Sequence, residues 1–324
     1  ARLAMAASRF WRIQGHFVEG RLWLETALTS EQLTDEMRGR LLYRAGSLAQ
    51  RQSDFDASRR LQTSGLRVSK AAGDRENVAN CLNGLAVLAL SQGDDDQASR
   101  YFLESRVEYE AVNDTWGVAA CLLNLGNIAL GTNQHEEAFR LYTESLQQYR
   151  GLGDAALVAL CVTCLAGLAL GKGEYEEAAV LAAEGLELQP ESGDKLEIAY
   201  GRRLLGVARG HLGDIGDAIR LVGGAIEACH ELGSIDQTID ALREMGGLAA
   251  LAGNPDGAAR LWGAVEALAA GSGLTIDQSD QDRYEYRLVE ARGRVDRQTW
   301  DTMWRLGQAL TLDEAVELAL QSCE

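Results

Sequence analysis

Apolar residues recur along the chain at the spacing of an α-helix, and short polar or glycine-containing breaks separate the apolar segments. Within residues 119–154, Leu122, Leu125 and Ile128 fall on one helical face, because residues three and four apart lie on the same side of a helix. A second apolar face follows Asn133, a residue type that tolerates the left-handed backbone just past a helix end. This stretch therefore predicts two helices folded back on each other.

The same plan repeats with a step of about 40 residues, and self-similarity at a fixed step is the sequence signature of stacked repeats. Three kinds of position keep this step: a small residue early in the second helix, the chain reversal, and a small residue within the first helix. The small residues early in the second helices are Ala57, Ala98, Ala138, Ala178, Ala218 and Ala258. The chain reversals are at Gln52, Gly93, Asn133, Gly173, Gly213 and Gly253. The small residues within the first helices are Ala45, Ala86, Gly126, Ala166, Gly206 and Gly246. The sequence therefore predicts an all-α solenoid, a right-handed superhelix of about eight helix hairpins with a C-terminal capping helix.

The regular array is predicted to span residues 1–272, as about seven helix pairs with a period near 40. Residues 273–324 are predicted to form a degenerate eighth pair, 277–292 and 296–306, and a short helix that begins at a capping box of Thr311 and Glu314. Atypical terminal units are expected because the last apolar face of a solenoid must be closed off. The chain opens inside a predicted helix with bulky residues, as a piece of a longer protein would.

Composition agrees with a helical binding protein. The chain of 324 residues has only 2 prolines, and its net charge of −17 argues against general binding to nucleic acid or to an anionic membrane. No apolar run reaches the ~20 residues of a membrane span, and no signal peptide is visible. Cys81, Cys121 and Cys161 share one repeat position, which indicates buried thiols and a reducing, cytoplasmic compartment.

No constellation of catalytic or metal-binding residues emerges from the sequence. Residues 167–173 contain Gly171-Lys172, but the spacing, the missing hydroxyl and the helix-to-helix context do not fit a phosphate loop. Cys161 and Cys164 have C-x-x-C spacing without a second ligand pair, which favours packing over metal or redox chemistry. We therefore expect neither enzymatic activity nor a cofactor.

The helix-hairpin unit resembles the tetratricopeptide repeat, and the run Asn124–Asn127 is similar to the long-helix repeats of kinesin light chain and of spindle adaptors. Both ends of the chain resemble the C-terminal repeat region of large bacterial regulators of the LuxR and AfsR/MalT kind, in Phe10-Trp11, Gly15-His16, Glu19-Gly20-Arg21, Trp23-Leu24, Ala259–Ala264, Tyr284, Trp300, Trp304 and Ala309–Ala315. In that family an ATPase module and a winged helix precede the repeats, and a DNA-binding domain lies at one end. The resemblance implies an effector- or partner-sensing module.

First helices line the concave side of hairpin stacks of this type, so their polar residues are the candidate binding groove. Counting by the repeat register places nine residues there: Arg9, Arg12, Asn80, Asn83, Asn127, Thr163, Tyr200, Arg203 and Arg243. Asparagine amides can pair with an extended peptide backbone, and arginine can bind a carboxylate or phosphate through two hydrogen bonds. Solvated helix surface is the alternative interpretation for any one of these residues.

The sequence thus predicts a non-enzymatic sensor module of a bacterial transcriptional regulator. Its groove would bind a peptide, a protein or a small anionic effector, and its other partners would be the remaining domains of the parent regulator. A stand-alone protein-interaction adaptor and a peptide-pheromone receptor are the two alternatives. Flanking sequence would separate the regulator from both alternatives, because only the regulator carries a phosphate loop upstream or a helix-turn-helix domain beside the repeats.

Overall fold

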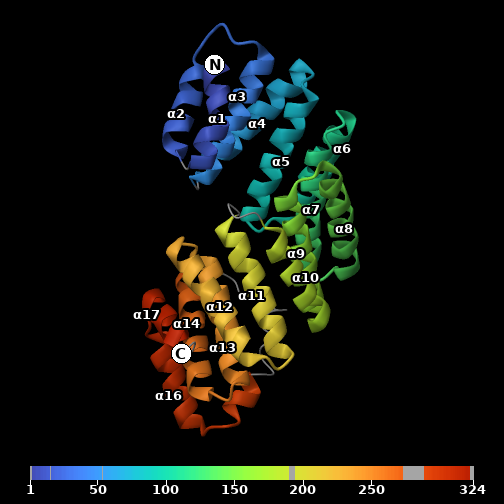
Figure 1. The fold of residues 1–324 in the computed structure, drawn as a ribbon. Helices are drawn as coiled ribbons and strands as arrows, with labels where there is room; N and C mark the ends of the chain where they lie inside the picture. Colours follow the sequence, from blue (N-terminus) through green and yellow to red (C-terminus); the bar gives the residue numbers. More distant parts are fainter. Residues whose placement is uncertain (1, 15, 53, 190–193, 273–287, 322–324) are drawn as a thin grey trace. The chain divides into compact units, whose positions relative to one another are not determined.

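A computed structural model describes residues 2–14, 16–52, 54–189, 194–272 and 288–321. These residues form antiparallel helices joined by short turns, as the repeat pattern predicts (Figure 1). The helices are α1 Arg2–Gln14, α2 Phe17–Leu28, α3 Asp35–Arg51, α4 Phe55–Ala72, α5 Arg75–Ser91, α6 Asp95–Ala111, α7 Thr115–Gly131, α8 His135–Leu152, α9 Ala155–Lys172, α10 Tyr175–Leu188, α11 Lys195–His211, α12 Ile215–Glu231, α13 Ile235–Leu251, α14 Pro255–Ser272, α16 Arg297–Gln308 and α17 Leu312–Gln321. The described residues are therefore all-α, and consecutive helices pair as hairpins.

The chain divides into two compact units, Ala1–Gly153 and Asp154–Glu324. The first unit contains the pairs α1/α2, α3/α4, α5/α6 and α7/α8. The second contains α9/α10, α11/α12 and α13/α14, followed by α16 and α17. The predicted boundary after residue 272 falls beside residues 273–287, which lie outside the described part of the chain, so that boundary stays a prediction.

Helix starts from α3 to α14 follow one another at steps of 20 residues, from Asp35 to Pro255. The turn before most of these helices holds one residue in the left-handed conformation, which glycine adopts without strain. Asn133 (φ 57°) and Gly173 (φ 78°) are two of them, as predicted. The others are Gly73, Gly93, Asn113, Gly153, Gly213, Gly233 and Gly253. Gln52 has φ −91° and is the exception among the reversals named from the sequence.

At several joints one residue both closes a helix and caps the next one. The Asp94 backbone N–H donates to the Ala89 carbonyl (3.0 Å), which is the six-residue bond of a Schellman motif. Its side-chain Oδ1 accepts from the Gln97 N–H (3.0 Å) and caps α6. Asp74, Asp114, Asp214 and Asn254 make the same two bonds at their own joints.

Small residues lie where the helices of a pair approach most closely. A Cβ at Gly126 of α7 would lie 2.5 Å from the Tyr142 ring of α8, closer than atoms can pack without a shift. The equivalent Ala45, Ala86 and Ala166 are fully buried. Cys81, Cys121 and Cys161 are buried as well, and burial raises the pKa of Cys81 to about 12 and that of Cys121 to about 11. The predicted packing role of these residues is therefore confirmed.

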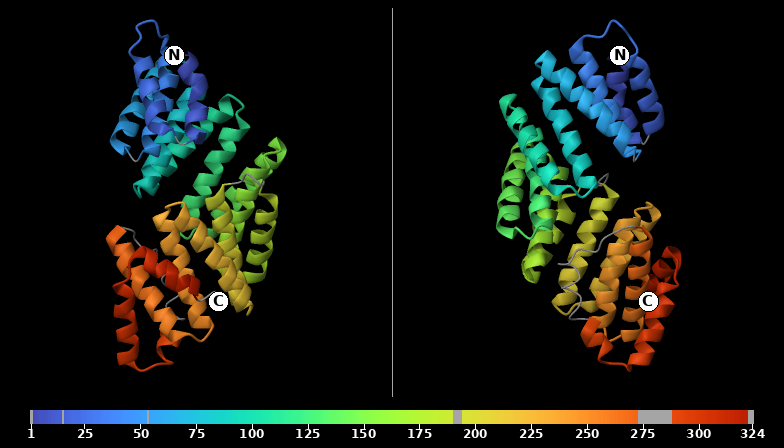
Figure 2. Two further views of the ribbon diagram at one scale, coloured as in Figure 1. Left: turned by 60° about the vertical axis from the view of Figure 1, so that its left-hand side comes forward. Right: turned by 180° about the vertical axis from the view of Figure 1, so that it is seen from behind.

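The C-terminal helices close the apolar end of the second unit. α17 packs on α12, α13 and α14, and α16 packs on α14 (Figures 1 and 2). The predicted capping box is present: Glu314 Oε2 accepts from the Thr311 N–H (2.8 Å), and Thr311 Oγ1 accepts from the Glu314 N–H (3.3 Å). Residues 288–292 are helical, whereas 277–287 of the predicted eighth pair lie outside the described residues.

α9 is long and apolar enough to cross a membrane by length and composition, contrary to the expectation that no segment would qualify. More than half of this helix is buried inside the protein. A buried core helix meets the same criteria, so this feature by itself is weak evidence for a membrane span.

The left-handed turns predict a specific stability loss. Replacing Gly173 with Val should lower the free energy of unfolding by about 1–2 kcal/mol or more, because a β-branched residue is strained at positive φ. Gly216 of α12 has no such conformation, and an added Cβ there meets no atom within 4 Å. Gly216→Val is the matched control and should leave stability nearly unchanged in urea denaturation. Equal stability of the two variants would mean that the turn is placed wrongly.

Candidate recognition surface

The first helices of the pairs carry the polar residues that the sequence places in a groove. α3 contacts α5 in the first unit, and α11 contacts both α9 and α13 in the second. In the first unit, α6 packs against both α5 and α7, so these two first helices flank it. We call the partly exposed asparagines of α5 and α7 (Asn80, Asn83, Asn124 and Asn127) the asparagine surface.

Asn80 is oriented by a tyrosine from the neighbouring helix. The Tyr109 hydroxyl of α6 donates to Asn80 Oδ1 (2.9 Å), and the same ring lies against Gly117 of α7. Burial raises the pKa of Tyr109, which keeps the hydroxyl protonated as a donor. Because the amide oxygen is occupied, the Asn80 NH₂ group is the part that is left to donate to a ligand. It makes no hydrogen bond with the described residues.

Asn127 is held in the same way. The Tyr142 hydroxyl of α8 donates to Asn127 Oδ1 (2.8 Å), and the asparagine itself is exposed. Asn124, one turn earlier, donates its amide to the Ala120 carbonyl (2.8 Å) and so offers its oxygen as an acceptor. Asn83 is half-buried, and its Oδ1 atom is fully buried without a hydrogen bond from the described residues, so this oxygen is not open to a ligand. The asparagine surface therefore combines oriented donors with an acceptor, and α7 contains no charged residue.

Thr163 and Arg243 are buried and do not belong to an accessible groove, contrary to the prediction. The Thr163 hydroxyl donates to the Ala159 carbonyl (2.9 Å) inside α9. Arg243 is 4% exposed and pairs with Asp240 (3.0 Å). Every residue of α13 from Ala241 to Ala250 is buried, because α11, α12, α14 and α17 surround this helix.

Tyr200 and Arg203 of α11 do lie together, half-buried. The Arg203 guanidinium is 5.2 Å from the centre of the Tyr200 ring, within the range of a cation–π contact. Arg203 also pairs with Glu244 of α13 (3.3 Å), a carboxylate that is 2% exposed. Burial raises the pKa of Tyr200 to about 12. An anionic ligand at Arg203 would therefore have to compete with a carboxylate that is already in place.

Two sequence candidates remain, the arginines of α1 and the glycine-rich residues 167–173. Arg9 and Arg12 lie in α1, but their side chains are outside the described part of the structure. Residues 167–173 form the end of α9 and a left-handed turn at Gly173, which is the predicted helix end. Among the residues that the structure describes, no group of three or more histidine, cysteine, aspartate or glutamate side chains could hold a metal ion.

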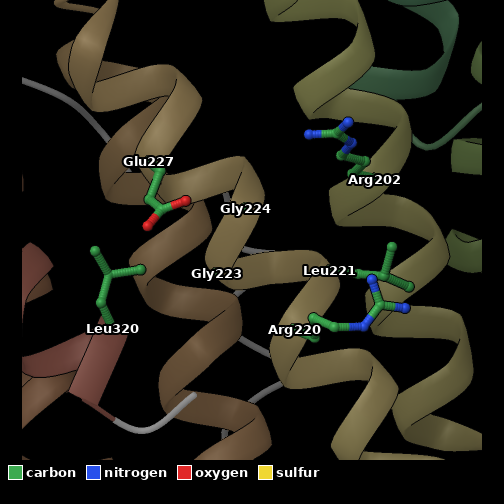
Figure 3. Close-up of a pocket in the computed structure, with 7 residues that line it drawn as sticks. All are labelled: Arg202, Arg220, Leu221, Gly223, Gly224, Glu227 and Leu320. Carbon is green, nitrogen blue, oxygen red and sulfur yellow. The ribbon is translucent and has the colours of Figure 1, made fainter. Parts of the chain in front are cut away.

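A pocket of about 590 Å³ that was not predicted from the sequence lies in the second unit, between α11, α12 and α17. Its polar residues are Arg202, Arg220 and Glu227, and two adjacent glycines of α12 form part of its wall (Figure 3). The available signal was the glycine pair Gly223-Gly224 within a helix, since glycine is unfavourable in helix interiors and such a pair needs a structural reason.

Comparison with known proteins identifies the repeats. Tetratricopeptide repeat family models match residues 38–106 and residues 118–150. No curated protein sequence matches the chain significantly.

Solved structures with this fold are similar over most of the chain. A Rap protein complexed with Competence and Sporulation Factor has a TM-score of 0.62 and 14% identity, over 98% of this chain and 95% of that one. NprR in complex with its cognate peptide NprX has a TM-score of 0.57 and 13% identity, over 94% and 85%. A Signal Transduction ATPase with Numerous Domains from Pyrococcus horikoshii, with a tetratricopeptide repeat sensor, has a TM-score of 0.54 and 13% identity, over 94% and 44%. The chain is similar to these proteins in fold.

Glu197, beside Tyr200 on α11, supplies a pH-dependent prediction. Burial, with a smaller contribution from the Asp194 charge, raises the pKa of Glu197 above its ordinary value. The folded state therefore binds a proton more readily than the unfolded state, so this residue lowers stability at neutral pH, and the loss is relieved as pH falls through the raised pKa. Glu197→Gln should be more stable than the parent at pH 7, and the difference should shrink as the pH is lowered.

Thermal denaturation between pH 4 and pH 8 measures this effect. Glu177→Gln is the matched control, because Glu177 occupies the same third position of α10 and is exposed. A pH-independent difference between Glu197→Gln and the parent would contradict the assignment.

Proposed function

Because residues 38–106 and 118–150 are tetratricopeptide repeats, we propose that this chain is a non-enzymatic recognition module. It binds an extended peptide segment of a partner at the asparagine surface. The observation that carries this proposal is the pair of tyrosine–asparagine hydrogen bonds, Tyr109 to Asn80 and Tyr142 to Asn127. Each hydrogen bond fixes the Oδ1 atom of one carboxamide, so the asparagine side chain is already ordered before a ligand binds. Little side-chain entropy is therefore lost on binding.

A peptide backbone suits this surface better than a strongly charged ligand. An extended backbone offers alternating N–H and C=O groups, and asparagine can both donate to and accept from them. Because α7 has no charged side chain, this helix cannot form an ion pair with a charged ligand. Tyr200 and Arg203 are the corresponding proposed contact residues in the second unit, where the ring offers a flat apolar surface beside a guanidinium.

The proposed context is a bacterial, ATPase-linked transcriptional regulator in the cytoplasm. The similarity in fold to a signal-transduction ATPase with a repeat sensor supports this context. The similar part is 44% of that protein, so more than half of the ATPase lies outside the part that this chain resembles. In this context the repeats would sense an effector or partner and contact the other domains of the same polypeptide. The net charge of −17 makes direct binding of nucleic acid or an anionic membrane by these repeats unfavourable.

A peptide-pheromone receptor is the second candidate. Two of the similar structures hold a signalling ligand, Competence and Sporulation Factor in one case and the peptide NprX in the other. Both candidates use the same surface and differ in whether the ligand is a free signalling peptide or a segment of a protein. A phosphate loop in flanking sequence would favour the ATPase-linked regulator.

The chain by itself should neither bind nor hydrolyse ATP. The glycine-rich residues 167–173 end a helix and do not form a phosphate loop. Isothermal titration calorimetry with ATP and Mg²⁺ checks this expectation, and micromolar binding would contradict it.

Peptide binding can be tested by selecting ligands for the native chain from a displayed random peptide library. Asn127→Ala should weaken a selected peptide roughly five- to a hundredfold, because a backbone group loses its partner at a cost of about 1–3 kcal/mol. Asn127→Asp keeps an acceptor for the Tyr142 hydroxyl but removes the amide donors, and it should also weaken binding.

Arg140→Ala is the control for this experiment. Arg140 is exposed on α8 and, within the described part of the chain, pairs only with its helix neighbours Glu137 and Glu144. Its replacement should therefore leave affinity unchanged. Equal affinities for the parent, Asn127→Ala and Arg140→Ala would show that recognition occurs elsewhere on the chain.

A further inference from the structure

The pocket between α11, α12 and α17 presents charges of opposite sign at opposite ends (Figure 3). Arg202 of α11 and Arg220 of α12 lie on one side of the glycine pair, and the Glu227 carboxylate lies on the other. Arg202 and Glu227 make no hydrogen bond or ion pair with the described residues. Arg220 forms an ion pair with Asp217, and Asp217 also pairs with Arg209. Leu221 and Leu320 add apolar wall, Leu320 from the C-terminal helix α17.

The glycine at the centre of this pocket is not needed for helix packing. A Cβ on Gly224 would meet only the Arg202 Nη1 atom, at 3.9 Å, within the 4 Å searched. By contrast, a Cβ on Gly206 would lie 2.8 Å from Val222, so close packing explains that glycine. Since glycine is unfavourable inside a helix, Gly224 lowers helix propensity without a packing gain, and its effect is to keep the recess open.

The spacing of the charges sets the size of the ligand. Arg220, Gly224 and Glu227 lie on one face of α12, and seven residues of helix place Arg220 and Glu227 about 10 Å apart along the axis. An extended dipeptide separates its amino and carboxylate groups by roughly 7 Å, and the flexible side chains close the difference. A carboxylate suits the two guanidinium groups, and an ammonium group suits Glu227.

We propose that this pocket binds a short zwitterion of dipeptide size, with its carboxylate at Arg202 and Arg220 and its ammonium group at Glu227. An apolar side chain of the ligand packs against Leu221 and Leu320. This site uses other helices than the asparagine surface and does not depend on the function proposed above. Because Leu320 belongs to α17, an occupied pocket also ties the C-terminal helix to α12.

Leucyl-leucine and two blocked derivatives test the proposal by calorimetry and NMR titration. Leucyl-leucine should bind, and its C-terminal amide should bind about two- to fivefold more weakly, because Arg202 and Arg220 are exposed and an exposed ion pair contributes about that much. N-acetyl-leucyl-leucine should also bind the parent chain more weakly than leucyl-leucine does. The Glu227→Gln variant should bind these two ligands equally. Binding of leucyl-leucine should slow hydrogen exchange in residues 312–321.

Variants of the chain provide the controls. Arg202→Ala should weaken leucyl-leucine binding about two- to fivefold, because this guanidinium is exposed. Gly224→Leu should weaken binding further by filling the recess. Gly216→Leu places the same side chain on α12 in open space and should bind like the parent, and circular dichroism verifies that every variant is folded. No binding of leucyl-leucine at millimolar concentration, equal binding of its amide, or undiminished binding by folded Gly224→Leu would overturn the proposal.

Discussion

The structure depends on a joint between helices that recurs every 20 residues. At several of these joints one residue both terminates a helix and caps the next. At Asp94 the backbone N–H satisfies a carbonyl of α5 while the side chain satisfies an N–H of α6. The left-handed residue before it, Gly93, turns the chain so that both bonds form together. Backbone N–H and C=O groups that would otherwise bond to water at the helix ends are therefore paired within the protein at such a joint. The regular spacing of the joints gives the helices between them nearly equal length.

Helix pairs joined in this way put a core tyrosine beside an asparagine at the edge of the core in two places, Tyr109 with Asn80 and Tyr142 with Asn127. The buried face of several second helices supplies a large residue against a small residue of the first helix, as Tyr142 does against Gly126 and Trp262 against Gly246. The tyrosine ring fills the core, and its hydroxyl reaches Asn127 at the edge of that core. The packing that stabilises a pair thereby also orients the polar group proposed to bind a ligand.

The fold could be predicted from the sequence because its determinants are local. Asn133, Gly173 and Gly126 each act within one hairpin, and the structure confirms their roles. The candidate site was less predictable, because exposure depends on contacts distant in sequence. Arg243 was placed in a groove by its register, yet α14 and α17 pack on the helix that carries it. Arg202 and Leu320 meet at one pocket although more than a hundred residues separate them, and no repeat pattern relates two such positions.

The central claim is that carboxamides oriented by buried tyrosines recognise an extended peptide backbone. A crystal structure of the chain with a peptide selected for binding tests it most directly. We expect peptide main-chain atoms within hydrogen-bond distance of the Asn80 and Asn127 amides, with the Tyr109 and Tyr142 hydrogen bonds still in place. A peptide bound on the second helices, or held by its side chains alone without contact to these amides, would show that the asparagine carboxamides are not the recognition groups.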